Sequence, residues 1–237
     1  MVHIEGILDG STAALIVISS VAFGLFSLYK SLKLKAKLLT IAGLAMIFVG
    51  FLWLGPTVDF IFVLLGKGNI PGDPPVAYVI LSYLWVAPAL IFAIYLGGEL
   101  IMPKKKWLLV GVYIALGIVF EYFLWFDTIA SFDELGVEVG FEGEKLINAS
   151  FETLHPTFLL IAVFLVSTLV LLGIGFAIKA KQSTGMLRKK FTYLSIGFII
   201  FVLSGALDSI IELPLAIGII RVVMATFALW MYLGLKT

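Results

Sequence analysis

Long apolar stretches alternate with short polar segments along the whole chain. A transmembrane helix needs about 20 mostly apolar residues. Seven stretches meet this length: residues 11–32, 38–65, 76–102, 107–127, 156–178, 191–212 and 214–234. Pro75, Pro156 and Pro214 each begin a stretch, where the missing N–H costs a helix nothing. The pattern predicts an all-α polytopic membrane protein, a seven-helix bundle forming one domain over residues 1–237.

Charged residues divide between the two ends of these stretches. Apart from Lys67, Lys145 and Arg221, the basic residues follow the first, third and fifth stretches or lie at the C-terminus. Every acidic residue except Glu99 lies toward the opposite end. Because short cytoplasmic loops carry the Lys and Arg excess, we expect the N-terminus outside and the C-terminus in the cytoplasm. The predicted location is the cell membrane, crossed several times.

Composition agrees with this class and narrows the chemistry. The chain is 62% hydrophobic and 13% charged, whereas soluble domains are about 45–50% apolar and about 25% charged. It has no cysteine and only two histidines, so we expect no metal site, no cofactor and no disulfide. The scarcity of Asn and Gln is typical of thermophilic proteins, archaeal ones included, and also of lipid-facing sequence in general. We expect no nucleic-acid partner.

Several activities are not expected from these residues. No Ser/His pair, Asp/Asp pair or HExxH pattern is present, and we predict that the protein is not an enzyme. A retinal pigment needs a lysine in the core of the last helix, and the only lysine there or beyond is Lys236, at its inner end.

Four ionisable residues interrupt apolar stretches at similar depth in the outer third: Asp59, Glu121, Asp208 and Arg221. At ~1.5 Å per residue, Arg221 lies roughly 10 Å below the outer surface and Asp208 about 8 Å below it. The two can therefore meet across the last helical hairpin. Glu212, four residues after Asp208, shares its helix face but lies nearer water.

These residues allow three interpretations. An ion pair between them can lock helices together, they can form a ligand or proton site, or Arg221 can extend its side chain to the interface. The excess of carboxylates over cations favours a bound proton or cation at such a site. Glu99 is the only acid in the inner half, so no continuous proton relay crosses the membrane.

Aromatic residues form a second candidate site. Trp53, Tyr83, Trp85 and Tyr122 lie in the second, third and fourth stretches. They could line an apolar pocket between these helices, or they could serve only as packing.

Two stretches resemble a known family. YLWVAPALIFAIYLGGEL (83–100) has a proline followed by Phe and Tyr at helical spacing, and STGMLRKKFTYLSIGFIIFVLSGALDSI (183–210) has a compact basic turn before a long apolar helix. Both are similar to the N-terminal seven-helix sensor region of archaeal and bacterial histidine kinases and related signalling proteins. The resemblance implies a sensor role, and it carries over no binding residue. Members of that family continue into an output domain, whereas this sequence stops at Thr237.

We therefore expect a receptor-like sensor that binds a small ligand, ion or lipid in its outer half. It would signal to a cytoplasmic partner or output domain, within a lipid bilayer. A transporter or channel for a small solute or cation is the first alternative, although Pro56 and Pro88 both fall in the first half rather than in matching halves. A structural or assembly subunit of a membrane complex is the second.

Overall fold

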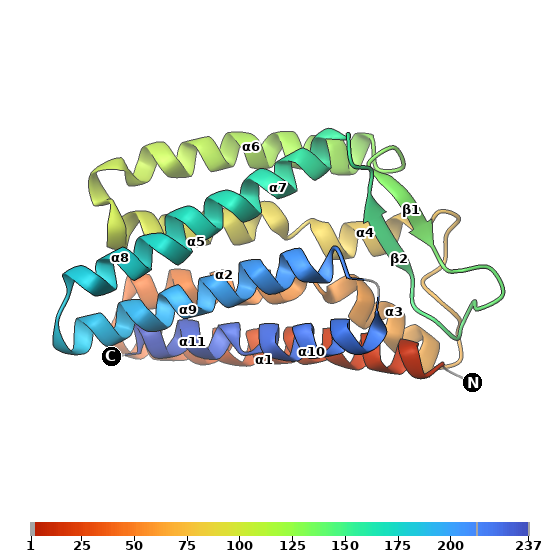
Figure 1. The fold of residues 1–237 in the computed structure, drawn as a ribbon, viewed down its shortest axis with the longest axis horizontal. Helices are drawn as coiled ribbons and strands as arrows, with labels where there is room; N and C mark the ends of the chain where they lie inside the picture. Colours follow the sequence, from red (N-terminus) through yellow and green to blue (C-terminus); the bar gives the residue numbers. More distant parts are fainter. Residues whose placement is uncertain (1–2, 212, 237) are drawn as a thin grey trace.

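The computed structural model describes residues 3–211 and 213–236 and is built mainly from helices (Figure 1). The helical elements are α1 (Ile4–Leu34), α2 (Lys37–Phe51), α3 (Leu54–Leu64), α4 (Val76–Tyr83), α5 (Val86–Ile101), η1 (Pro103–Lys105), α6 (Lys106–Phe126), α7 (Pro156–Thr168), η2 (Leu169–Ile174), α8 (Gly175–Gln182), α9 (Gly185–Asp208), α10 (Pro214–Ala225) and α11 (Phe227–Leu235). Six helical stretches are long and apolar enough to cross a membrane, and a seventh is added if the bent pair α2–α3 is one span. The predicted class, an all-α bundle with helices of membrane-spanning length, is confirmed.

Two helices begin earlier than the apolar pattern predicts. α1 begins at Ile4 rather than at residue 11, because the ring of His3 accepts the N–H of Glu5 and caps the helix at 3.4 Å. α9 begins at Gly185 rather than at residue 191. The early start of α1 places Asp9 inside a helix.

Two of the predicted spans are interrupted at a repeated sequence. Phe51–Pro56 reads FLWLGP and Tyr83–Pro88 reads YLWVAP, and in each the helix stops before the tryptophan and restarts after it. Proline has no N–H and its ring clashes with the carbonyl four residues earlier, so each proline falls in the first turn of the new helix. The chain bends by 50° between α2 and α3.

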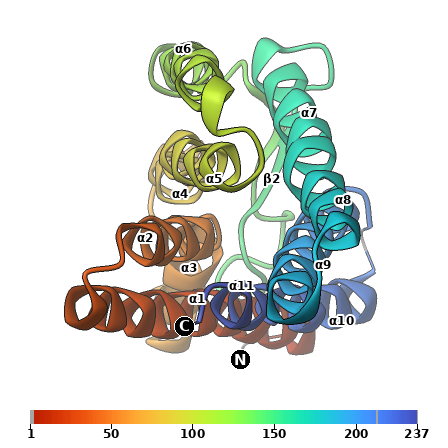
Figure 2. The same ribbon diagram turned by 90° about the vertical axis from the view of Figure 1, so that its left-hand side faces the viewer.

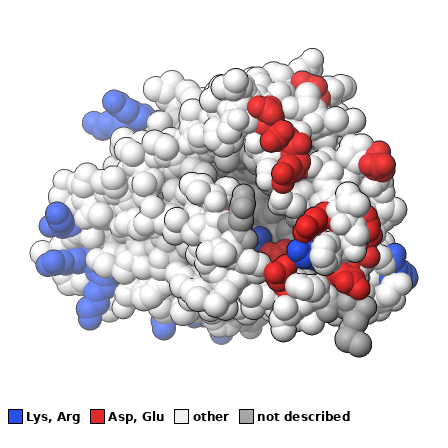
Figure 3. All heavy atoms as spheres, turned by 45° about the vertical axis from the view of Figure 1, so that its right-hand side comes forward, with Lys and Arg blue, Asp and Glu red and all other residues white. Residues whose placement is uncertain are grey.

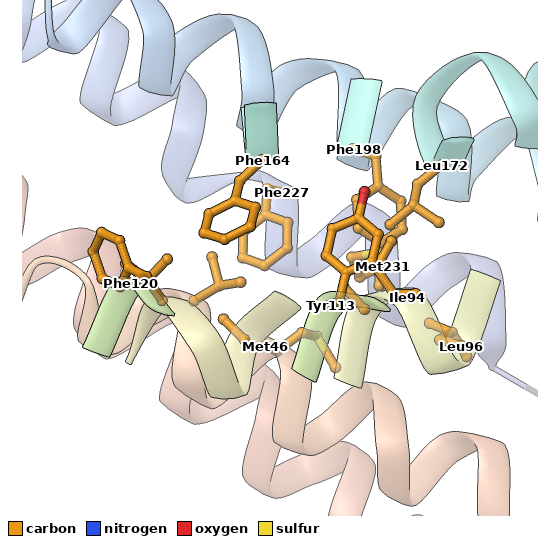
Figure 4. Packing of buried hydrophobic residues seen from close by; sticks show 14 of the residues in the cluster. Met46, Ile94, Leu96, Tyr113, Phe120, Phe164, Leu172, Phe198, Phe227 and Met231 are labelled. Atoms are coloured by element: carbon orange, nitrogen blue, oxygen red, sulfur yellow. The ribbon is translucent and has the colours of Figure 1, made fainter. Parts of the chain in front are cut away.

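The helices pack lengthwise around an apolar core. Figure 2, viewed along the bundle, shows α5 and α6 on one side and α7, α8 and α9 on the other, with α1 below. α1 packs against α2, α3, α10 and α11, and α9 packs against α8, α10 and α11. Figure 4 shows buried side chains from several helices meeting in the middle, among them Met46, Phe120, Phe164, Phe198 and Phe227.

A short β-hairpin covers one end of the bundle. β1 (Phe132–Gly136) pairs antiparallel with β2 (Asn148–Phe151), with Phe132 opposite Phe151 and an irregularity before Glu134. The rings of Phe132 and Phe151 stack at 4.6 Å, and Tyr83 at the end of α4 packs against both. We call this end of the molecule, which also holds the start of α1, the hairpin end; the opposite end is the basic end.

Candidate functional site

Arg221 is a buried cation two turns into α10, with 9% of its surface exposed. Its Nε donates a hydrogen bond to Oδ1 of Asp208, the last residue of α9, at 2.8 Å. Its Nη1 donates to the backbone carbonyl of Asp9 at 3.2 Å and also to the carboxylate Oδ1 of Asp9 on α1. Carboxylates of two other helices therefore hold one guanidinium group.

Trp53 completes this arrangement from the break between α2 and α3. Its indole Nε1 donates to Oδ2 of Asp208 at 3.3 Å, so both oxygens of that carboxylate have a donor. The ring is buried and lies edge-on to Phe201 of α9. We call Asp9, Trp53, Asp208 and Arg221 the Arg221 cluster; it joins α1, α9, α10 and the α2–α3 break.

Glycines bring the helices close enough for these contacts. A Cβ on Gly218 of α10 would lie 3.1 Å from Cγ of Leu8 on α1, and one on Gly10 would lie 2.1 Å from the ring of Phe60 on α3. A larger residue at Gly10 would force α1 and α3 apart. Gly218 therefore sets the distance between α10 and α1, and Gly10 sets the distance between α1 and α3.

The Arg221 cluster has more negative than positive groups. Two carboxylates face one guanidinium, so one negative charge is left over when all three groups are ionised. The side chain of Asp9 is 32% exposed, whereas those of Asp208 and Arg221 are 12% and 11% exposed. Among the described residues, Oδ2 of Asp9 receives no hydrogen bond. A proton or a small cation could reach the cluster on this side and neutralise the excess.

Asp59 forms a separate site and is not a partner of Arg221, which corrects one of the sequence predictions. It is fully buried on α3. It accepts hydrogen bonds from the backbone N–H of Ile70 at 2.7 Å, the side chain of Asn69 at 2.9 Å and the N–H of Ile147 at 2.9 Å. The segments after α3 and before β2 turn these donors onto the carboxylate. We call Asp59, Asn69, Ile70 and Ile147 the Asp59 cluster.

The segment between β1 and β2 is also tied to the start of α1. The N–H of His3 donates to the carbonyl of Glu144 at 2.9 Å. Lys145 Nζ contacts Glu138 at 2.9 Å and Glu5 at 3.0 Å. Hydrogen bonds to Glu138 and then Glu5 raise the pKa of Lys145. The hairpin is thus connected to the helix that carries Asp9.

Glu121 does not join the Arg221 cluster either. It lies on α6, which packs against α5 and α7 and not against α10. Both of its carboxyl oxygens are shielded from solvent without a hydrogen-bond partner in the described chain. Glu212, the remaining acid proposed from the sequence, lies outside the described residues.

The four aromatic residues predicted to line one pocket lie in different surroundings. Trp53 belongs to the Arg221 cluster, and Tyr83 packs under the hairpin. Trp85 lies against Phe48, and its Nε1 donates to the carbonyl of Leu81 at 3.1 Å. Tyr122 is 57% exposed on α6. The helix breaks beside Trp53 and Trp85 direct these rings to different neighbours, so the four form no shared pocket.

Asp9 is the member of the cluster that sequence reasoning missed. The first predicted stretch begins at residue 11, so Asp9 was placed before the first helix. The apolar residues Ile4, Ile7 and Leu8 before this pair were the available signal for an earlier start. In the structure they occupy the first turns of α1.

Acidic side chains surround a hollow at the hairpin end. Figure 3 shows Asp and Glu grouped around this hollow, whereas Lys and Arg gather mainly at the other end. A separate apolar groove of about 270 Å³ lies between α1 and α10, where Leu8, Gly218 and Val222 are part of its wall. The Arg221 cluster thus has an acidic face near it and an apolar groove beside it.

His155 has a structural role where it lies. Its Nδ1 accepts the N–H of Thr157 at the start of α7, and its Nε2 lies 3.2 Å from Asp127. Within residues 3–211 and 213–236, no three His, Asp or Glu side chains are placed to hold a metal ion.

Comparison with family models, with curated proteins and with solved structures found no match. The functional argument therefore depends on the geometry of this chain.

Proposed function

We propose that this chain is a receptor-like membrane sensor module with seven spans, in which α2 and α3 together make one span. In this proposal the N-terminus and the hairpin face the outside, and the basic end faces the cytoplasm and a signalling partner. The separation of charge seen in Figure 3 supports this orientation, because cytoplasmic loops carry the Lys and Arg excess. The resemblance to sensor regions of histidine kinases favours the same function.

The single observation that carries the proposal is the sharing of Arg221 by carboxylates of α1 and α9. Two carboxylates with one guanidinium favour uptake of a proton or small cation. Neutralising Asp9, the most exposed of the three, would weaken its attraction to Arg221. A ligand that binds one arrangement more tightly shifts the population toward it.

α1 offers a route from this cluster to the basic end. It is one unbroken helix of 31 residues, and it contacts the last span at a second point. There the hydroxyl of Ser19 donates to the carbonyl of Ala225 at 3.1 Å, just before the break at Thr226 between α10 and α11. A shift of α1 against α10 would therefore reach the middle of the last span and beyond.

The test uses the absence of cysteine from the sequence. Lys33→Cys on α1 and Met186→Cys on α9 place two spin labels at the basic end of the protein in nanodiscs. The distance between the two labels is measured by pulsed electron paramagnetic resonance in mildly alkaline buffer, in mildly acid buffer, and with added NaCl or CaCl2. We expect the distance distribution to change in at least one condition, and Asp9→Asn to abolish that change.

Asp133→Asn is the matched control, because Asp133 is an exposed acid of the hairpin. It should leave the response of the labelled protein unchanged. An identical distance distribution under all four conditions would reject a proton- or cation-driven sensor. A response that Asp133→Asn removes as well would show a general charge effect rather than action at Asp9.

A structural or assembly subunit is the second candidate, favoured by the hydrogen bonds that already hold Arg221 to two helices. In that case Asp9→Asn and Arg221→Met would lower stability or assembly, with no change of helix position in acid or salt. A transporter is not favoured, because the helix breaks beside Trp53 and Trp85 both lie in the first half of the chain rather than in matching halves. Uptake of labelled sodium ions into proteoliposomes tests that alternative.

A further inference from the structure

A groove at the basic end lies between α8 and α9 and has a volume of about 210 Å³. Lys181 of α8 and Arg188 of α9 form part of its wall. Both side chains are exposed, and neither forms an ion pair with a described residue. Two cations from two helices therefore face one concave surface, and no carboxylate of residues 3–211 or 213–236 pairs with them.

The remainder of the groove is uncharged. Ala177 and Ala180 line it from α8, and their small side chains leave space beside Ile196 of α9. Ser195 also lines the groove, but its hydroxyl is already used, donating to the carbonyl of Gly173 at 2.7 Å. The groove thus combines the positive charges of Lys181 and Arg188 with a mainly apolar surface.

We propose that this groove binds an anionic membrane lipid. Its phosphate would lie between Lys181 and Arg188, and one acyl chain would lie over Ala177 and Ile196. Arginine contacts phosphate with two parallel N–H donors, and basic pockets between helices near the membrane surface suit lipid headgroups. This site is independent of the Arg221 cluster and of the proposed sensor function.

Other cations at the same end provide a matched comparison. Lys104 and Lys105 are exposed on η1, and neither lines the α8–α9 groove. Lys106 is already paired with Glu99 at 2.6 Å. General attraction of basic residues to anionic lipid would act on Lys104 and Lys105 as strongly as on Lys181 and Arg188. Only specific binding in the groove would distinguish the two pairs.

The experiment measures lipid binding to the purified full chain in detergent by native mass spectrometry. Dioleoylphosphatidylglycerol is compared with dioleoylphosphatidylcholine, and inorganic phosphate is added as a competitor. We expect the anionic lipid to bind at least about tenfold more tightly than the zwitterionic one, and Lys181→Ala with Arg188→Ala to remove that preference. Lys104→Ala with Lys105→Ala should retain it.

Ala177→Leu tests the groove without changing charge. Filling the space should weaken binding of the anionic lipid severalfold. The helicity and melting temperature of the lipid-free protein are measured to check that the variant folds. If the Lys181/Arg188 double variant and the Lys104/Lys105 double variant lose the same amount of lipid affinity, the binding is general surface attraction and the proposal is overturned. Competition by inorganic phosphate without discrimination between the lipids would identify a free-anion site instead, and would overturn it too.

Discussion

The Arg221 cluster and the Asp59 cluster hold buried aspartates in opposite ways. Asp208 and Asp9 meet a cation, and their contacts join three helices. Asp59 meets no cation within the part of the chain that the structure describes; three N–H donors from the connecting segments surround it. Removing a carboxylate from water is costly in both cases, and the cost is offset by a guanidinium in one and by oriented dipoles in the other.

The contacts of the Arg221 cluster can change with ionisation, whereas the Asp59 cluster holds the connecting segments in place. The Asp59 cluster has one carboxylate and its donors belong to the same segments that it anchors, so it fixes the connection between the hairpin and α3. The Arg221 cluster has two acids that share one cation, so its contacts depend on which acids are ionised. This comparison leads to four predictions, from the largest expected effect to the smallest.

The largest effect is expected from Arg221→Met. Removing the cation leaves the buried carboxylate of Asp208 and the partly buried one of Asp9 facing each other, and the free energy of unfolding should fall by about 3 kcal/mol. Steric-trap unfolding in bicelles measures this change. Neutralising the acids as well, in Asp9→Asn/Asp208→Asn/Arg221→Met, should recover most of the loss. A triple variant as unstable as the single one would show that the charge imbalance is not the cause.

Asp59→Ala should have the next largest effect, a loss of about 2 kcal/mol, because it leaves buried N–H groups without an acceptor. Hydrogen exchange should accelerate at the amides of Ile70 and Ile147, whereas amides of α10 should change little. Asp133→Ala, at an exposed position of the hairpin, is the control. If the two clusters are independent, combining Asp59→Ala with Arg221→Met should add their losses within about 0.5 kcal/mol; a larger coupling would join them into one site.

The structure also shows which parts of these clusters a sequence can reveal. Asp208 is the last residue of α9, and Arg221 lies seven residues after Pro214, where α10 begins. Counting from the turn therefore places them at similar depth, and they are in contact. The three donors to Asp59 lie 10, 11 and 88 positions away along the chain. No helical spacing encodes such contacts, since they depend on how the connecting segments fold back over the bundle.

The positions of helix ends and helix breaks were the other features that the sequence did not predict. Apolar length predicts that a span exists, and each of the seven predicted stretches is mainly helical over its described residues, but this length does not fix where a helix begins. The cap at His3 extends α1 through Asp9, and the prolines at 56 and 88 interrupt two spans beside tryptophans. Reading the repeated Leu-Trp-x-x-Pro pattern as two breaks would have separated Trp53 from Trp85.

Trp53→Phe should have a smaller effect than Asp59→Ala. The substitution keeps an aromatic ring beside Phe201 but removes the hydrogen bond to Oδ2 of Asp208. We expect a loss of about 1 kcal/mol, the usual contribution of one such bond. Trp85→Phe is the matched control, because the indole of Trp85 donates to a backbone carbonyl outside the cluster. Trp53→Phe is also made in the Asp208→Asn background. If the bond to Asp208 is responsible, the stability lost on Trp53→Phe should be smaller there than in the original protein.

The smallest effect is expected at Glu121, and it has the opposite sign from the change at Asp59. Both acids are shielded from water, but Glu121 has no donor to its oxygens in the described chain. Glu121→Gln should therefore leave the free energy of unfolding unchanged or raise it by up to about 1 kcal/mol, since no hydrogen bond is lost and a group that resists burial is replaced. Asp59→Asn, the equivalent change where donors surround the carboxylate, should lower it. The same unfolding assay in bicelles measures both. A clear loss at Glu121 would mean that its carboxyl group has a partner outside this chain, such as a lipid or a neighbouring subunit.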